Sequence, residues 1–243
     1  MPVRRNSHAA LIDDLVSANH ILCAEGIVDG FGHVSVRDET HLERFLLARS
    51  MAPATVTVRD VMTFDLDGEP IDAKGRKAYV ERFIHSEIYR ARPDVQAVVH
   101  SHSPAVIPFG ITGTNLRAVS HMGGFLGLST PIFEIRAAGG PATDMLIRNR
   151  TLGAALARSL GASPYALMRG HGSIAVGDSI KQVVYRAIYA EVNARLQMEA
   201  LRLGPINYLT AEEALGAMRA NDAVIDRPWD LWKSKVRKRG RRN

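Results

Sequence analysis

Two histidines, separated by one residue, end an apolar segment near the middle of the chain. Residues 95–102 read VQAVVHSH, which places imidazoles at His100 and His102. Because side chains alternate between the two faces of a strand, both imidazoles project from the same face, two residue rises of about 3.3 Å each apart. This spacing allows both to bind one metal ion, since metal–nitrogen bonds are about 2.1 Å long. The alternative is two unrelated polar residues where a strand ends.

A third histidine and a carboxylate extend this candidate site. His171 lies between Gly170 and Gly172, which let the backbone bend sharply and bring the imidazole near another strand; a polar hairpin turn is the alternative. Glu81 shares one face of an expected helix with His85, four residues later. A carboxylate beside a divalent cation can be a ligand or a proton carrier, whereas an isolated glutamate is usually a surface residue. Three histidines leave coordination positions open, as in catalytic metal sites.

Alternating helices and strands must position these residues. Hydrophobic periodicity and turn residues predict helices at 7–25, 79–92, within 143–160, at 179–203 and near 210–220. Strands are expected at 33–37, 44–49, 61–65, 95–102 and 131–135, and as a strand–turn–strand unit across 165–176. The sequence has neither a Gly-x-Gly-x-x-Gly turn nor a Walker loop, so nucleotide binding has no support. The class is α/β or α+β with one layered core.

Length and composition fit one folded domain. The chain has 243 residues, of which 46% are hydrophobic and 23% charged. It has no apolar run of about 18 residues, so we expect no transmembrane helix. With no recognisable secretory signal, we expect a cytoplasmic protein. A single cysteine, Cys23, excludes an intramolecular disulfide and a cysteine-cluster zinc site.

The basic charge is concentrated at the C-terminus. Seven of the 31 Lys and Arg residues fall within 233–243, which leaves 24 basic against 25 acidic residues elsewhere. We therefore expect a domain over 1–232, ending in a helical extension, and a disordered basic tail over 233–243. The tail has no aromatic residues on which bases could stack, so nucleic-acid binding is not expected.

Several of these segments together resemble the class II aldolase/adducin family. They are 32–37 (GHVSVR), 81–85 (ERFIH), 92–94 (RPD), 97–104 (AVVHSHSP) and 170–172 (GHG). The likeness spans roughly residues 8–205. It implies a single-domain, three-layer α/β/α fold with a mostly antiparallel central sheet. It also implies a homotetramer with active sites at subunit boundaries.

The resemblance also implies roles for the candidate residues. His100, His102 and His171 would be the metal ligands, and Glu81 the acid/base carboxylate. The cofactor would be one divalent ion per subunit: Zn²⁺ is usual in the aldolases, whereas the decarboxylase members suggest Mn²⁺. Histidine ligands alone do not choose between the two ions. His121 falls where the sugar-phosphate aldolases place a tyrosine acid from a neighbouring subunit, so it is a second candidate proton carrier; an ordinary loop histidine is the alternative.

The chain departs from the sugar-phosphate aldolases of the family where those enzymes hold phosphate. Small polar residues are typical there, but this chain carries His33, residues 48–53 (ARSMAP), Tyr79 and Val80. Tyr79 and Val80 cannot replace the two serines of the aldolases, so the hydroxyls that would bind phosphate are largely missing. This counts against a phosphorylated sugar as substrate.

The remaining side chains suit a flat, anionic substrate. Arg49 can pair with a carboxylate, Ser50 can donate a hydrogen bond, and His33 and Tyr79 can add polar or aromatic contacts. For Arg49 the alternative is a surface position at the end of a strand. The set resembles the family's decarboxylases of hydroxylated aromatic or pyridine dicarboxylates, such as dihydroxyphthalates or the 3-hydroxy-2-methylpyridine-4,5-dicarboxylate of vitamin B6 degradation.

We therefore expect a metal-dependent carboxy-lyase. In the expected reaction the metal stabilises an enolate and Glu81 transfers the proton. The alternatives are a sugar-phosphate aldolase or dehydratase, and a non-enzymatic, adducin-like interaction domain. The three histidines and Glu81 weigh against the last, because a scaffold does not need an open metal site.

Overall fold

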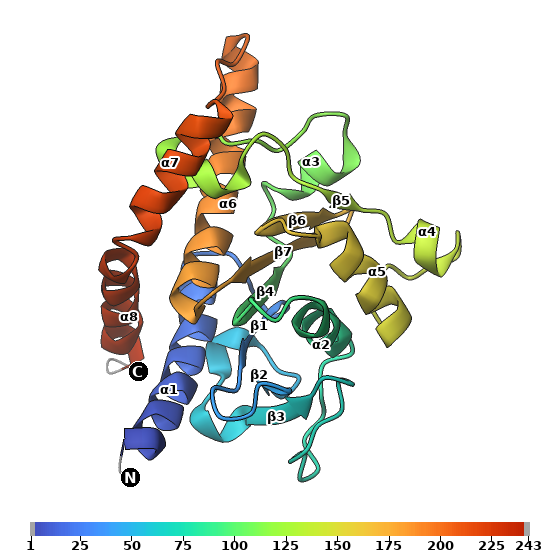
Figure 1. Cartoon of the computed structure of the whole chain (residues 1–243), viewed down its shortest axis with the longest axis vertical. Helices are drawn as coiled ribbons and strands as arrows, with labels where there is room; N and C mark the ends of the chain where they lie inside the picture. The colour runs from blue at the N-terminus through green and yellow to red at the C-terminus, as the bar shows by residue number, and fades with distance from the viewer. Residues whose placement is uncertain (1–2, 241–243) are drawn as a thin grey trace.

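A seven-stranded sheet runs through the middle of the molecule (Figure 1). The computed structural model describes residues 3–240, and side chains within 8–238. The strands are β1 (His33–Arg37), β2 (Arg44–Ala48), β3 (Val61–Asp65), β4 (Ala97–Ser101), β5 (Ile132–Phe133), β6 (Tyr165–Met168) and β7 (Gly172–Gly177). They lie in the order β3-β2-β1-β4-β7-β6-β5, and only β5 and β6 are parallel neighbours. The expected mostly antiparallel sheet is confirmed.

Helices cover both faces of the sheet (Figure 1). The long helices α1 (Val3–Ala24) and α6 (Ile180–Leu203) cover one face, with α7 (Ala211–Asp222) and α8 (Asp226–Gly240) outside them. On the other face α2 (Arg82–Ala91) packs beside α5 (Arg150–Leu160). Short helices α3 (Ile107–Ile111) and α4 (Arg136–Gly139) and the 3₁₀ turns η1 (Pro53–Thr55), η2 (Val58–Asp60) and η3 (His121–Leu126) complete the chain. The three-layer α/β/α arrangement is confirmed.

Strand alternation divides the apolar side chains into two cores. In β4, Val99 points into the core under α1 and α6, whereas Val98 points into the core under α2 and α5. His100 is two residues from Val98 and therefore shares the face that α2 covers. Pairing of β1 with β4 sets His33 opposite His100 on that same face. The sheet thus presents His33 and His100 to α2.

The predicted elements are present, with shifts at several of their boundaries. β4 ends at Ser101, so His102 follows the strand instead of lying within it. Helix α2 begins at Arg82, and Glu81 is its N-cap residue rather than part of the helix. Helices α3 and α4 and the turns η1, η2 and η3, which are all short, were not predicted. Across residues 3–240, no helix combines the length and the apolar character needed to cross a membrane.

The expectation of a disordered basic tail is wrong for residues 233–240, which continue helix α8. Acidic residues of α1 hold this helix: Lys233 pairs with both Asp13 (2.9 Å) and Asp14, and Arg237 pairs with Asp13 (2.8 Å). Trp229 and Trp232, at the start of α8, are buried in the same core as α1 and α6. Residues 241–243 lie outside the described part of the chain.

The close contact between α2 and α5 generates a stability prediction. A Cβ added at Gly153 of α5 would lie 2.4 Å from the backbone oxygen of Phe83 in α2. Backbone cannot rotate away as a side chain can, so we expect Gly153→Ala to lower the free energy of unfolding by about 1–3 kcal/mol. Urea denaturation measures the change. Gly216→Ala in α7 is the control, because its Cβ would meet nothing within 4 Å. Equal midpoints for the two variants would contradict close packing at Gly153.

Candidate metal centre

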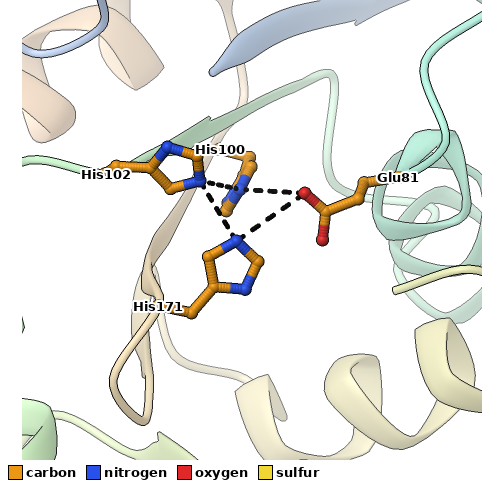
Figure 2. A group of neighbouring side chains, drawn as sticks. All are labelled: Glu81, His100, His102 and His171. Atoms are coloured by element: carbon orange, nitrogen blue, oxygen red, sulfur yellow. Dashed lines mark hydrogen bonds and ion pairs between the residues drawn. The ribbon is translucent and has the colours of Figure 1, made fainter. Parts of the chain in front are cut away.

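Four side chains from three separate segments converge on one point (Figure 2). His100 lies in β4 and His102 directly follows that strand. His171 lies in the turn between β6 and β7, which Gly170 closes with a φ of 63°. Because β7 pairs with β4, this turn is brought beside the end of β4. Glu81 approaches from the opposite side, at the start of α2.

The spacing of the three imidazoles fits one metal ion. The Nε2 atom of His102 lies 3.2 Å from Nε2 of His100 and 3.1 Å from Nε2 of His171. Nitrogens bound to one ion at about 2.1 Å lie about 3.0–3.4 Å apart in octahedral or tetrahedral geometry. Glu81 Oε2 is 3.5 Å from Nε2 of His100 and 3.7 Å from Nε2 of His171. All four donor atoms lie within 4.8 Å of one another.

Hydrogen bonds to the backbone orient two of these side chains, His100 and Glu81. Nδ1 of His100 lies 3.2 Å from the carbonyl oxygen of Ser173. A carbonyl only accepts, so Nδ1 carries the proton and Nε2 keeps its lone pair toward the centre, as in metal-bound histidines. Glu81 Oε1 accepts a hydrogen bond of 2.9 Å from the backbone N–H of Ile147. Its other oxygen, Oε2, therefore faces the imidazoles.

The charge states also favour a divalent cation. Burial, reinforced by the charge of His100, lowers the pKa of His102 and brings that of His171 to about 4. Burial alone would raise the pKa of Glu81, but His100, His171 and the N–H of Ile147 outweigh it and lower the pKa to about 2. Near neutral pH His102 and His171 are therefore unprotonated and Glu81 is ionised, the forms that bind metal. These residues fit a divalent cation.

His33 and Tyr79 lie beside the centre. The ring centroid of His33 is 5.1 Å from that of His100 and 4.7 Å from that of Tyr79. The Tyr79 hydroxyl donates to the carbonyl of Met51, so this residue offers the face of its ring more than its hydroxyl. The structure thus brings two of the four candidate substrate residues next to the metal ligands.

Arg49 and Ser50 follow β2, farther from the ligands. Arg49 is close enough to Tyr79 for its charge to oppose the burial that raises the Tyr79 pKa. It also has a partner within the chain, because its Nε donates 2.6 Å to Asp60 Oδ1. Only the guanidinium nitrogens of Arg49 that Asp60 does not use are left for a substrate. The backbone N–H of Ser50 donates to the carbonyl of Lys77, and its side chain is exposed.

His121 does not join the four donors within the same subunit. It opens η3, where Asn221 donates to its backbone oxygen (2.9 Å) and contacts its Nδ1 (3.3 Å). It lines a separate pocket of about 660 Å³ with residues of α6, α7 and α8. Its role as a proton carrier stays a prediction that requires a neighbouring subunit.

Three buried polar residues beside the centre were not predicted. His85 lies 2.6 Å from His33, and Ser35 and Tyr89 continue the contacts behind it. Two periodicities point to them: Ser35 is two residues from His33 in β1, and His85 and Tyr89 are four residues apart in α2. Sequence alone does not show that these strand and helix faces meet.

Comparisons with known proteins agree with this geometry. The family described as Class II Aldolase and Adducin N-terminal domain matches residues 13–198. The chain belongs to this family. Decarboxylase tropJ of Talaromyces stipitatus is 40% identical over 244 residues, covering 91% of this chain and 92% of the relative. The 3,4-dihydroxyphthalate decarboxylase of Arthrobacter keyseri is 32% identical over 210 residues and covers 82% of each chain.

The solved structure of an aldolase II superfamily protein from Pseudomonas syringae has the same fold. It aligns with a TM-score of 0.79 at 19% identity, covering 96% of this chain and 94% of the other. Similarity at that identity shows the class II aldolase fold and nothing about substrate. The two relatives from Talaromyces stipitatus and Arthrobacter keyseri, by contrast, are both named decarboxylases.

The ligand assignment predicts the effect of removing imidazoles. His100→Ala or His102→Ala should remove most of the bound metal, because each change takes away one of four donors. Elemental analysis after gel filtration measures metal per subunit. His41→Ala, at a histidine whose side chain is 57% exposed beside Asp38, is the control and should keep the metal. Unchanged metal in both ligand variants would refute the assignment.

Buried His85 predicts a pH dependence of stability in metal-free protein. Burial lowers its pKa from 6.5 to about 3. Between these values the unfolded chain binds a proton that the folded chain does not. The free energy of unfolding should therefore fall as the pH is lowered from about 6.5 to about 3. Urea denaturation of chelator-treated protein at several pH values measures the slope. His85→Gln, which removes the titrating group, should make the slope shallower, and an identical slope would contradict the assignment.

Proposed function

We propose that this protein is a divalent-metal-dependent carboxy-lyase that releases carbon dioxide from a hydroxylated aromatic acid. The observation that carries the proposal is the convergence of three imidazole Nε2 atoms and one carboxylate at spacings suited to a single ion. The decarboxylase relatives support the reaction class, since 40% and 32% identity extend over most of the chain. An interaction domain alone would not need this centre.

The walls of the site support an aromatic acid as substrate. The rings of His33 and Tyr79 lie beside the ligands and suit stacking with a flat ring. We propose that the free part of the Arg49 guanidinium, with Ser50, binds a substrate carboxylate. A hydroxylated benzene dicarboxylate of the dihydroxyphthalate type is favoured over a pyridine dicarboxylate, because a relative of 32% identity is named for that substrate.

His100, His102 and His171 would hold the ion, Mn²⁺ or Zn²⁺. When bound, it would supply Lewis-acid chemistry, withdrawing electron density from substrate oxygens. The carboxylate of Glu81 completes the donor set or exchanges a proton beside it. Its anchored Oε1 leaves Oε2 as the oxygen able to do either.

Glu81 moves the proton in the proposed reaction. Its pKa of about 2 means that the carboxylate starts ionised and must first accept a proton. Oε2 would take the proton of the ring hydroxyl and deliver it to the ring carbon that carries the carboxylate. The bond to the carboxylate then breaks, carbon dioxide leaves, and the bonding electrons restore the aromatic ring with a phenolate oxygen. That oxygen takes one proton from solvent, so the reaction consumes one proton in all.

We further propose that the subunits form a homotetramer. Within its own subunit His121 lies in a separate pocket with Asn221. A role in proton transfer would therefore be exerted in the site of a neighbouring subunit.

The mechanism predicts a separation of metal binding from turnover. Glu81→Gln should lower carbon dioxide release from 3,4-dihydroxyphthalate by about 100-fold or more, since the amide cannot exchange the proton. Bound metal should change little, because His100, His102 and His171 remain to hold the ion. Glu69→Gln, at a glutamate 63% exposed, is the control. Retained turnover in Glu81→Gln would disprove the proton role, and cleavage of a sugar phosphate without carbon dioxide release would replace the proposal.

The substrate pose predicts a binding defect in Arg49→Ala. Loss of a charge-assisted hydrogen bond should raise KM for a dicarboxylate by about 10- to 100-fold, equivalent to about 1.5–3 kcal/mol, with a smaller effect on kcat. Steady-state kinetics of carbon dioxide release measure both. Arg59→Ala removes an exposed positive charge nearby and is the matched control. Equal KM values in the two variants would show that the carboxylate binds elsewhere.

A further inference from the structure

A chain of buried polar side chains runs from the metal centre into the space between β1 and α2. Nδ1 of His33 lies 2.6 Å from Nε2 of His85, and Nδ1 of His85 lies 2.6 Å from Oγ of Ser35. The Ser35 oxygen lies 2.8 Å from the hydroxyl of Tyr89. These four groups form a continuous hydrogen-bonded line whose first member touches a metal ligand.

The chain is sealed from solvent at its inner end. His85 and Ser35 are completely buried, and Tyr89 is 1% exposed. The ring of Phe45 stacks on His85 and tilts against Tyr89. Apolar surroundings make an unsatisfied donor costly, so the protons at this inner end must all find acceptors.

Two proton arrangements are conceivable, and the Tyr89 end decides between them. If Nδ1–H of His33 donated to Nε2 of His85, the hydrogen bonds would all point inward. Nδ1–H of His85 would donate to Ser35, and Ser35 would donate to Tyr89. The Tyr89 proton would then need another acceptor. Besides Ser35, its hydroxyl has a hydrogen bond with the backbone of Val98, which lowers the Tyr89 pKa as a donating N–H does, and an N–H cannot accept the proton. If Tyr89 donates to Ser35, then Ser35 donates to Nδ1 of His85, and Nε2–H of His85 donates to Nδ1 of His33. In this direction the one proton left without a partner is that on Nε2 of His33, beside the metal centre, instead of the Tyr89 proton in the sealed interior.

The surroundings of Tyr89 keep it a donor. Burial raises the pKa of its hydroxyl well above the usual value and outweighs the opposing effects of Ser35 and of the Arg37 guanidinium over the ring. Arg37 is occupied by backbone carbonyls, including that of Tyr89 itself, so it holds the residue in place. The phenol therefore remains protonated near neutral pH.

We propose that Tyr89, Ser35 and His85 are positioning residues that lock His33 as its Nε2–H tautomer, making it a fixed hydrogen-bond donor to an anionic oxygen of the substrate. None of the described residues hydrogen-bonds Nε2 of His33. The ring stands between those of His100 and Tyr79, so this N–H is available at the wall of the site. The substrate part of the inference rests on the proposed carboxy-lyase function, whereas the tautomer does not.

A donor set in advance suits charge that develops during reaction. Its position and proton do not have to reorganise when negative charge grows on a substrate oxygen, which is the condition for electrostatic stabilisation. A free histidine would instead be distributed between two tautomers, and one of them would present a lone pair to the anion. The buried line removes that unfavourable form.

Long-range ¹H–¹⁵N correlation spectra of protein carrying ¹⁵N-labelled histidine test the tautomer directly. They need no activity, and the His33→Gln variant identifies the His33 signals by their loss. We expect wild-type His33 to be protonated at Nε2, and His85→Phe, which keeps a ring but removes both nitrogens, to yield a mixture of tautomers. His85→Gln, whose amide can still donate to His33, should restore the Nε2–H form. A wild-type His33 protonated at Nδ1 would overturn the proposal.

Kinetics test what the locked tautomer does. We expect His85→Phe to lower kcat/KM for 3,4-dihydroxyphthalate by about 10- to 100-fold, with bound metal unchanged and with partial recovery in His85→Gln. Tyr165→Phe is the matched control, because it too removes a buried hydrogen-bonding group. The Tyr165 hydroxyl donates to Ser173 Oγ on the opposite face of the sheet. Equal losses in His85→Phe and Tyr165→Phe would indicate general destabilisation and overturn the positioning role.

The two failures remain distinguishable. If wild-type protein releases no carbon dioxide from any hydroxylated aromatic acid, the proposed function fails, and the spectra still decide the tautomer. If His85→Phe does not fold, Ser35→Ala breaks the same line with a smaller change of volume and should give the same mixture of tautomers. Wild-type turnover with an unaffected Ser35→Ala variant would count against the positioning role alone.

Discussion

The site depends on how helix α2 packs against the face of β1 and β4. This helix places Glu81, at its N-terminus, beside the three histidines. From its buried side, His85 and Tyr89 contact residues of β1. The approach is close because Gly153 of α5 lets the backbone of α2 lie against it. A shift of α2 would move the proton carrier and the support of His33 together, so packing and chemistry are a single constraint in this molecule.

The electrostatics of the centre follow from that packing. Burial drives His102 and His171 toward their neutral form, and Glu81 stays ionised beside them. A buried carboxylate among neutral groups lacks compensation, and a divalent cation bound to the same atoms supplies it. Affinity for metal and stability of the fold are therefore coupled, because the unfolded chain presents no such cluster of deprotonated donors.

Local periodicity made part of the site predictable. The alternation of residues in a strand places His100 and His102 on one side, and the glycines around His171 predict its turn. Their convergence depends on β7 pairing with β4, which no local pattern reveals and which came only from the resemblance to the family. The pairing of Arg49 with Asp60 was missed because the acid lies 11 residues away on a 3₁₀ turn. The order of residues 233–240 in α8 was missed because the partners of this segment, Asp13 and Asp14, are near the other end of the chain.

The fold of this family is used for different reactions, so the reaction must be set by the residues that surround the candidate metal ligands. In the proposed mechanism α2 offers two kinds of proton to that space. The carboxylate of Glu81, anchored through one oxygen, can accept and release a proton during turnover. The proton on His33 is held by a buried line ending in a phenol that does not ionise, so it can be donated in a hydrogen bond but not given away. One helix thus combines a mobile proton for the ring carbon with a stationary one for the oxygen that takes up the charge.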